Sequence, residues 1–323
     1  MAKLFPQTTI AVIWDFDKTL APGYMQRPLF EHFGVDGADF WQEVEGLADF
    51  YRRSGVGMVE DDTLYLEHIL TYVRQGEFAG LSNRMLRDLG ADIEFYPGIP
   101  AFFDELRKYV EAEPRFAEHG IAVEHYVVST GLRQMIMGSR IAGHVDGVWG
   151  CEFADTIPMP GYLENRQQEL FDPSEADRQI AQVVYALGYT TKTRALFEIN
   201  KGSNVNENID VNSKLDEEDR RIPFQNMIYI ADGPSDIPTF AVVRQQGGRA
   251  YGVYRPESRA EFEQAAGLLE QGRIHAFGEA NYEPGTQSHL WIRHAVEQIA
   301  QRIVNDRSVA IEDRLGPPPG HID

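Results

Sequence analysis

The sequence contains almost no cysteine. Cys151 is the only one in 323 residues, which excludes an internal disulfide and a zinc site built from several cysteines. It lies in the apolar stretch 148–153, where we interpret it as a small buried side chain and not as a nucleophile. The nine histidines lack the spacing of metal ligands, so we interpret them as surface or packing residues.

Long hydrophobic runs are also absent. No stretch approaches the length needed to cross a membrane, and the first residues, M-A-K-L-F-P-Q, lack the apolar region of a signal peptide. We therefore predict a soluble, cytoplasmic protein without a membrane partner.

Positive charge is scarce. The chain has 30 Lys and Arg against 50 Asp and Glu, which gives a formal net charge of -20 and opposes binding to nucleic acid or to an anionic membrane surface. The same charge repels a small phosphorylated substrate. Any anion site must therefore create its own positive potential from a metal, a lysine or backbone amides.

What the sequence does contain is an alternation of short apolar runs and amphipathic segments. We predict strands at 10–14, 125–128, 148–153, 227–231, 250–254 and 274–277. We predict helices at 100–112, 132–141, 174–188, 192–200, 237–245, 258–271 and 288–305, that at 174–188 from a start signal at Ser174 and Asp177. The pattern predicts a doubly wound, mainly parallel, Rossmann-like α/β sheet.

The segment 21–96 differs, because it contains only helical patterns. They cover about 28–33, 39–53, 61–75 and 83–89, and the third carries Leu66, Ile69, Leu70 and Val73 at helical spacing. We predict an all-helical cap domain at 21–96, inserted into an α/β core formed by 1–20 and 97–307. Within that core we interpret the polar stretch 202–223 as a mobile surface loop, and we expect the tail 308–323 to be disordered.

Two carboxylates, Asp15 and Asp17, directly follow the first apolar run. A solvated D-x-D turn is the simple interpretation. However, ligands of open α/β sheets collect at the carboxyl ends of the strands, and buried carboxylates need a cation, hydrogen bonds or a catalytic use.

Four stretches in chain order resemble the motifs of the haloacid dehalogenase (HAD) superfamily, and the helical insertion resembles its phosphoserine-phosphatase-like branch. They are D-F-D-K-T at 15–19, V-V-S-T-G with Ser129, T-K-T-R-A-L-F with Lys192, and I-A-D-G-P-S-D with Asp232 and Asp236. Three of the four directly follow predicted strands.

The resemblance implies a role for each of these residues. Asp15 would be the nucleophile that forms an aspartyl-phosphate, and Asp17 would protonate the leaving oxygen and then accept a proton from water. Ser129 would bind the phosphoryl group, although an N-cap is the structural alternative and Thr130 could replace it. Lys192, which opens a helix, would hold the transferring group; Lys201 is the other lysine that we considered.

The resemblance also implies Mg²⁺ as cofactor. Its ligands would be the Asp15 carboxylate, the backbone carbonyl of Asp17 and Asp232. Asp236 would lie behind these ligands and hold the metal site or the lysine, and Gly233 would permit a tight turn.

The predicted function is Mg²⁺-dependent hydrolysis of a small phosphorylated metabolite. By the same resemblance, an aspartate at position 17 favours hydrolysis of a phosphate ester, because the branches that attack carbon–halogen bonds or hold a long-lived phosphoenzyme generally carry another residue there. Phosphoserine itself is disfavoured, because the segment 21–27 lacks the glutamate with which that branch binds the substrate ammonium. The alternatives are a phospho-acceptor that signals without turnover and a phosphoprotein phosphatase, which a closed helical cap would disfavour.

Overall fold

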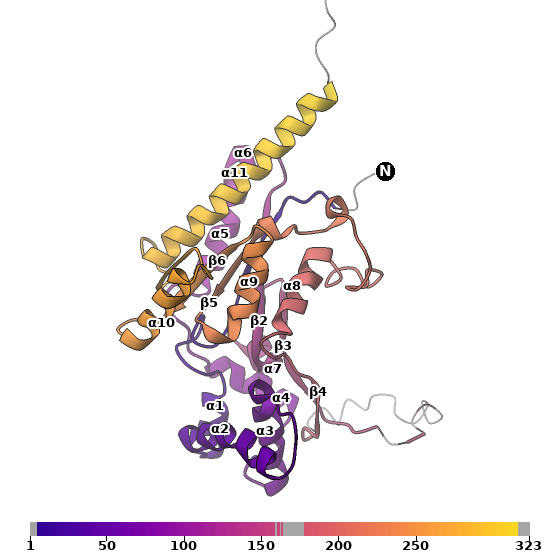
Figure 1. Cartoon of the computed structure of the whole chain (residues 1–323), viewed down its shortest axis with the longest axis vertical. Helices are drawn as coiled ribbons and strands as arrows, with labels where there is room; N and C mark the ends of the chain where they lie inside the picture. The colour runs from indigo at the N-terminus through magenta and orange to yellow at the C-terminus, as the bar shows by residue number, and fades with distance from the viewer. Residues whose placement is uncertain (1–4, 159, 162, 164–177, 316–323) are drawn as a thin grey trace, which may run out of the picture.

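A computed structural model of the chain describes residues 5–158, 160, 161, 163 and 178–315, with side chains described as far as residue 309. Over these residues the strands form a seven-stranded sheet with the order β4-β3-β2-β1-β5-β6-β7 (Figure 1). The strands are β1 Thr9–Trp14, β2 Ala122–Leu132, β3 Gly147–Ala154, β4 Gln182–Tyr185, β5 Met227–Ala231, β6 Arg249–Tyr254 and β7 Ala276–Glu279. All neighbours pair in parallel except β3 and β4, so the predicted doubly wound, mainly parallel sheet is confirmed.

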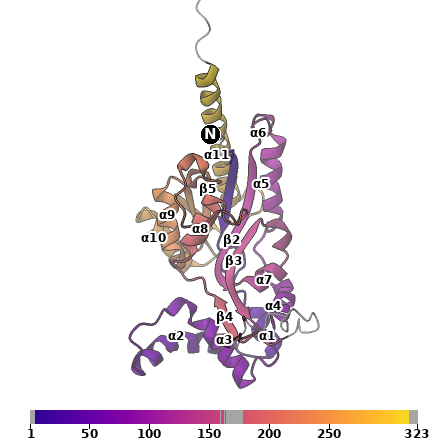
Figure 2. The same cartoon turned by 90° about the vertical axis from the view of Figure 1, so that its right-hand side faces the viewer.

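Helices cover both faces of this sheet. They are α5 Ala101–Ala112, α6 Pro114–Ala117, α7 Arg133–Gly138, α8 Lys192–Lys201, α9 Ile237–Gln245, α10 Arg259–Glu270 and α11 Gln287–Leu315. Figure 2 shows α5 on one side of the strands and α8 and α9 on the other. Because both faces are covered, the central strand β1 is buried from Ile10 to Trp14, as its unbroken apolar run requires.

Four further helices lie together at the end of the molecule away from the tip of α11 (Figure 1). They are α1 Arg27–Phe33, α2 Gly37–Arg53, α3 Leu64–Gln75 and α4 Asn83–Leu89. The rings of Phe30, Phe40 and Phe78 pack against one another between them. The apolar positions predicted for the third helix are all buried: Leu66, Ile69, Leu70 and Val73.

Two predicted elements differ from the structure. Of the helix predicted at 174–188, residues 174–177 lie outside the described residues, and 182–185 form the edge strand β4 instead. The sequence Q-V-V-Y has the β-branched and aromatic residues that suit a strand. The tail prediction was wrong for 308–315, where α11 continues because no Gly or Pro interrupts it before Gly316; residues 316–323 lie outside the described residues.

The polar stretch 202–223 forms turns and one short 3₁₀ helix, Glu217–Asp219. The Lys201 ammonium donates hydrogen bonds to the carbonyls of Val211 (2.5 Å) and Ser213 (2.7 Å), which fix one side of the loop. Its mobility stays a prediction. Among the described residues no helix is both long and apolar enough to span a bilayer.

Strand register brings the motifs together at one edge of the sheet. Trp14, the last residue of β1, pairs with Val127 of β2 on one side and with Ile230 of β5 on the other. In parallel strands the residues that follow a common register level leave the sheet at the same edge. The segments that begin at Asp15, Ser129 and Asp232 therefore emerge side by side.

Candidate active site

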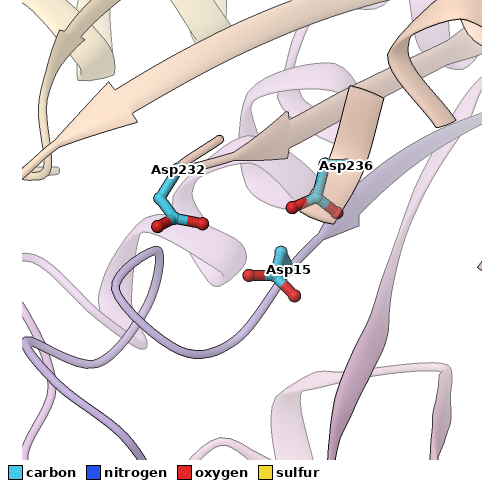
Figure 3. A group of neighbouring side chains, drawn as sticks. All are labelled: Asp15, Asp232 and Asp236. Carbon is cyan, nitrogen blue, oxygen red and sulfur yellow. The ribbon is translucent and has the colours of Figure 1, made fainter. Parts of the chain in front are cut away.

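Three carboxylates converge where β1 and β5 end. The backbone N–H of Asp15 donates to the Ile230 carbonyl at 2.9 Å, which carries the sheet one residue beyond β1. Asp15 is 4% exposed. One carboxylate oxygen from each of Asp15, Asp232 and Asp236 lies within 4.8 Å of the other two, and Figure 3 shows these carboxylates facing a common space.

A buried ammonium contacts two of these carboxylates. Lys192 Nζ lies 2.7 Å from Asp15 Oδ1 and 2.7 Å from Asp236 Oδ1, and the lysine is fully buried. Burial alone would lower the pKa of Lys192, but the charges of Asp15 and Asp236 outweigh it and raise that pKa above its ordinary value. Lys201, at the other end of α8, donates its hydrogen bonds to the loop carbonyls described above.

Asp236 is held from several sides. Its Oδ1 also accepts a hydrogen bond from the Tyr229 hydroxyl, and its Oδ2 accepts one from Ser235 Oγ at 2.7 Å. Sequence reasoning missed Tyr229, because a tyrosine in an apolar strand reads as a packing residue. The available signal was a hydroxyl in the otherwise aliphatic run M-I-Y-I-A, directly before D-G-P-S-D. Asp236 is thereby fixed against Lys192.

Asp17 lies on the turn that leaves β1. Its Oδ1 accepts a hydrogen bond from the Met25 backbone N–H at 2.9 Å, which ties the start of the 21–96 segment to the carboxylate. Thr19 is fully buried, and its hydroxyl donates to Asp15 Oδ2 at 3.4 Å. The Tyr282 hydroxyl donates to the Thr19 carbonyl at 2.7 Å, so the turn is held from the core as well.

The S-T-G stretch forms a bulge and not a helix cap. Pairing between β2 and β3 shifts register between Val128 and Leu132, which leaves residues 129–131 outside the regular ladder. Ser129 Oγ accepts the Gly131 N–H at 3.0 Å, whereas the residue at the N-cap of α7 is Leu132. The N-cap interpretation of Ser129 was therefore wrong, and its buried hydroxyl lies in the bulge.

An uncharacterized protein of Borreliella burgdorferi is 39% identical over 294 residues, which cover 90% of this chain and 97% of that protein. The chain belongs to the family of this protein. No protein-family model matches the chain.

Comparison of whole structures shows the fold. A probable phosphoserine phosphatase from Vibrio cholerae aligns with a TM-score of 0.50 and 10% identity over 92% of this chain and 68% of that one. A HAD family hydrolase from Salmonella enterica serovar Typhi aligns with a TM-score of 0.46 and 12% identity over 84% of this chain and 67% of that one. The first of these two alignments shows a shared fold, in agreement with the doubly wound α/β fold expected from the sequence.

The site carries an excess of negative charge. Burial raises the pKa of Asp15 to about 6. The charge of Lys192 opposes this rise, and the like charge of Asp236 adds to it. Burial and the charge of Asp15 raise the pKa of Asp17 to about 8. Burial and the charges of Asp15 and Asp236 raise the pKa of Asp232 well above its usual range. Several carboxylate oxygens that converge in a buried place are the donor set that Mg²⁺ prefers, so these residues fit a magnesium ion.

Gly233 follows Asp232 in the turn that leaves β5, with φ 162° and ψ −122°. Its role in permitting this turn stays a prediction. A Cβ at this position would meet the flexible end of Gln264, which donates to the Asp232 carbonyl at 3.2 Å. The missing side chain of Gly233 thus leaves room for Gln264 to reach the Asp232 carbonyl.

A cavity of about 470 Å³ adjoins the segment that follows the D-x-D turn. Its lining is mainly apolar and aromatic, and it includes Tyr24, Met25, Phe30, Trp41 and Ile93. Charged side chains also line it: Arg27 forms ion pairs with Glu31 (3.8 Å) and Glu94 (3.1 Å). The acids at this cavity thus come from outside the segment 21–27, and both are paired.

Proposed function

We propose that the chain is a Mg²⁺-dependent phosphatase that hydrolyses a small phosphomonoester through an aspartyl-phosphate. The observation that carries this proposal is the position of Asp15. It is a buried carboxylate at the end of the central strand, 2.7 Å from Lys192 Nζ and grouped with Asp232 and Asp236. A nucleophile beside a fixed positive charge is what phosphoryl transfer requires, because the reacting oxygens gain and lose negative charge.

The reaction would proceed in two displacements. The Asp15 carboxylate attacks phosphorus, the ester P–O bond breaks, and Asp17 gives its proton to the leaving alcohol. Asp17 then accepts a proton from a water molecule, whose oxygen attacks phosphorus and releases inorganic phosphate and the Asp15 carboxylate. The Ser129 hydroxyl would donate its proton to a phosphoryl oxygen throughout, and Lys192 would keep Asp15 oriented.

The metal site fits this scheme. Asp15, the backbone carbonyl of Asp17 and Asp232 would hold Mg²⁺, while Asp236 fixes Lys192 beside them. When bound, the ion would compensate the carboxylate charges and those of the phosphoryl group, so that a dianionic ester could approach.

The substrate would be a small phosphorylated metabolite, with the helical segment 21–96 as a cap that excludes water and contacts the leaving group. The mainly apolar cavity beside Tyr24 and Met25 supports an alcohol other than serine. The two acids near it are already paired with Arg27 and are poorly placed to recognise a free ammonium group.

The test is release of p-nitrophenol from p-nitrophenyl phosphate, with Mg²⁺ and with a chelator. We expect activity that requires Mg²⁺ and that falls at least about 1,000-fold in Asp15→Asn, because the amide cannot form the phosphoenzyme. Asp306→Asn, an exposed aspartate on α11, serves as the matched control and should retain activity. Activity that survives in Asp15→Asn, or that ignores chelation, contradicts the mechanism.

A screen that compares turnover of phosphorylated metabolites with turnover of phosphopeptides identifies the physiological ester. Faster turnover of phosphopeptides would mean that the chain is a phosphoprotein phosphatase and not an enzyme of small metabolites. A stable phosphate on Asp15 without turnover would replace it by a phospho-acceptor that signals.

A further inference from the structure

The carbonyl of Thr130 lies at the centre of the bulge in β2, between Ser129 and Gly131. Because the bulge removes these residues from the ladder with β3, the carbonyl needs partners from elsewhere. Two side chains provide them. The Tyr65 hydroxyl donates to Thr130 O at 2.6 Å, and the Cys151 thiol donates to the same oxygen at 3.2 Å.

Tyr65 comes from α3, which belongs to the helical segment and not to the sheet. The residue is 5% exposed, and its ring packs against Trp41 of α2 with centroids 5.7 Å apart. The ring thus anchors the tyrosine in the helical segment while the hydroxyl reaches into the bulge. This hydrogen bond connects α3 to the peptide beside Ser129.

A second connection from the same region of the chain reaches the segment that leads to Lys192. Asp62, in the short 3₁₀ helix Asp61–Thr63 before α3, accepts the Tyr189 backbone N–H at 2.6 Å. The approach is close, since a Cβ on Gly188 would lie 2.6 Å from Asp62 Oδ2. Tyr189 precedes Lys192, the first residue of α8, by one helical turn.

Cys151 joins these two connections. Its Sγ accepts the Leu187 backbone N–H at 3.2 Å while its thiol donates to the Thr130 carbonyl. The buried cysteine of β3 therefore bridges the bulge and the segment 187–191. Cys151 is buried, as expected from the sequence, but it also forms hydrogen bonds and does more than fill space.

We propose that Tyr65 and Asp62 are positioning residues, which set the geometry of the bulge 129–131 and of the segment 187–191 when α3 rests on the core. This inference rests on the proposed phosphatase function. The bulge 129–131 and Lys192 therefore reach their final positions only when the helical segment packs on the core. Packing of the helices and completion of the site occur together. Neither residue touches the substrate in this scheme.

The direct test is Tyr65→Phe, which removes the hydroxyl and keeps the ring. We expect kcat for p-nitrophenyl phosphate to fall about tenfold with KM nearly unchanged, because a misplaced bulge weakens binding of the transition state more than of the substrate. Tyr72→Phe is the matched control. Its hydroxyl, on the same helix, donates to Glu43 of α2 at 2.8 Å, within the helical segment and away from the bulge. It should leave kcat unchanged.

Amide hydrogen exchange on the whole chain gives a readout that does not depend on turnover. Tyr65→Phe should speed exchange at residues 129–132, and Asp62→Ala should speed it at 187–191, while Tyr72→Phe changes neither. The double variant Tyr65→Phe/Cys151→Ala tests whether the two side chains act together. Because both donate to one carbonyl, the loss in log kcat of the double variant should differ from the sum of the losses in the two single variants.

The proposal and the phosphatase function fail in different ways. A wild-type chain that hydrolyses no phosphomonoester removes the function, and the exchange measurement still decides whether Tyr65 orders the bulge. Exchange and kcat in Tyr65→Phe that match those of Tyr72→Phe overturn the positioning role, whatever the wild-type activity.

Discussion

Two buried titratable centres adjoin the end of β1, and they are built on opposite principles. His125, fully buried on β2, has both ring nitrogens satisfied: Nδ1 accepts from Trp14 Nε1 at 3.2 Å, and Nε2 donates to the Phe103 carbonyl at 3.1 Å. One acceptor and one donor fit a neutral imidazole. At the adjacent strand end, several carboxyl groups surround Asp15 and Lys192 with their charges unbalanced.

This difference in charge balance indicates that the His125 centre has a structural role and the Asp15 centre a functional one. A centre whose hydrogen bonds and charges are complete stabilises the fold and has nothing left to bind with. A centre that keeps an excess of like charge under burial costs stability, and it persists where a ligand or a reaction uses that charge. The unbalanced centre is the one that the proposed chemistry uses.

Removing the lysine should give the largest effect. Lys192→Met leaves Asp15 and Asp236 buried without their counter-charge, so we expect the free energy of unfolding to fall by about 3–5 kcal/mol and phosphatase activity to be lost. Urea titration and turnover of p-nitrophenyl phosphate measure both. Lys201→Met is the control, because the ammonium of this lysine hydrogen-bonds to loop carbonyls and not to the carboxylates around Asp15 in the described residues. Equal losses of unfolding free energy and of activity in Lys192→Met and Lys201→Met would mean that Lys192 does not act through the carboxylates around it.

Adding the cation should give the next largest effect. If Mg²⁺ binds the carboxylates of the folded chain alone, it should raise the free energy of unfolding by about 2.7 kcal/mol at one hundred times its dissociation constant. Thermal unfolding with Mg²⁺ and with EDTA measures this gain, which Asp232→Asn should greatly reduce. Asp306→Asn should keep it. A gain that persists in Asp232→Asn would place the ion elsewhere.

The unbalanced centre was the more predictable of the two from sequence. Asp15 and Asp232 follow apolar strands that pair in parallel, so the strand register brings them together, and Asp236 joins them from the turn after Asp232. Lys192 was separable from Lys201 because it opens a helix.

Other features depend on side-chain contacts between distant segments, which no local pattern encodes. Tyr229, Tyr65 and Cys151 each read as packing residues, and their hydrogen-bond partners lie in other elements. The strand β4 was missed because an apparent helix start at Ser174 competed with its β-branched residues. The balanced pair of Trp14 and His125, which lie 111 positions apart, belongs to no motif that would have joined the two residues.

The smallest expected effect lies in the balanced centre and has the form of a pH dependence. Burial lowers the pKa of His125 to about 3, against about 6.5 in an unfolded chain. Between these values the unfolded state binds more protons, so the stability due to this residue is complete above pH 6.5 and is lost as the pH falls, by about 1.4 kcal/mol at pH 5.5. Asp15 and Asp17, whose pKa values are raised, act with the opposite sign. The measurement is therefore the difference between the wild type and His125→Gln in unfolding free energy from pH 8 to pH 5.5. Parallel curves for the two proteins would show that His125 is not held neutral, and the contrast between the two centres would fail.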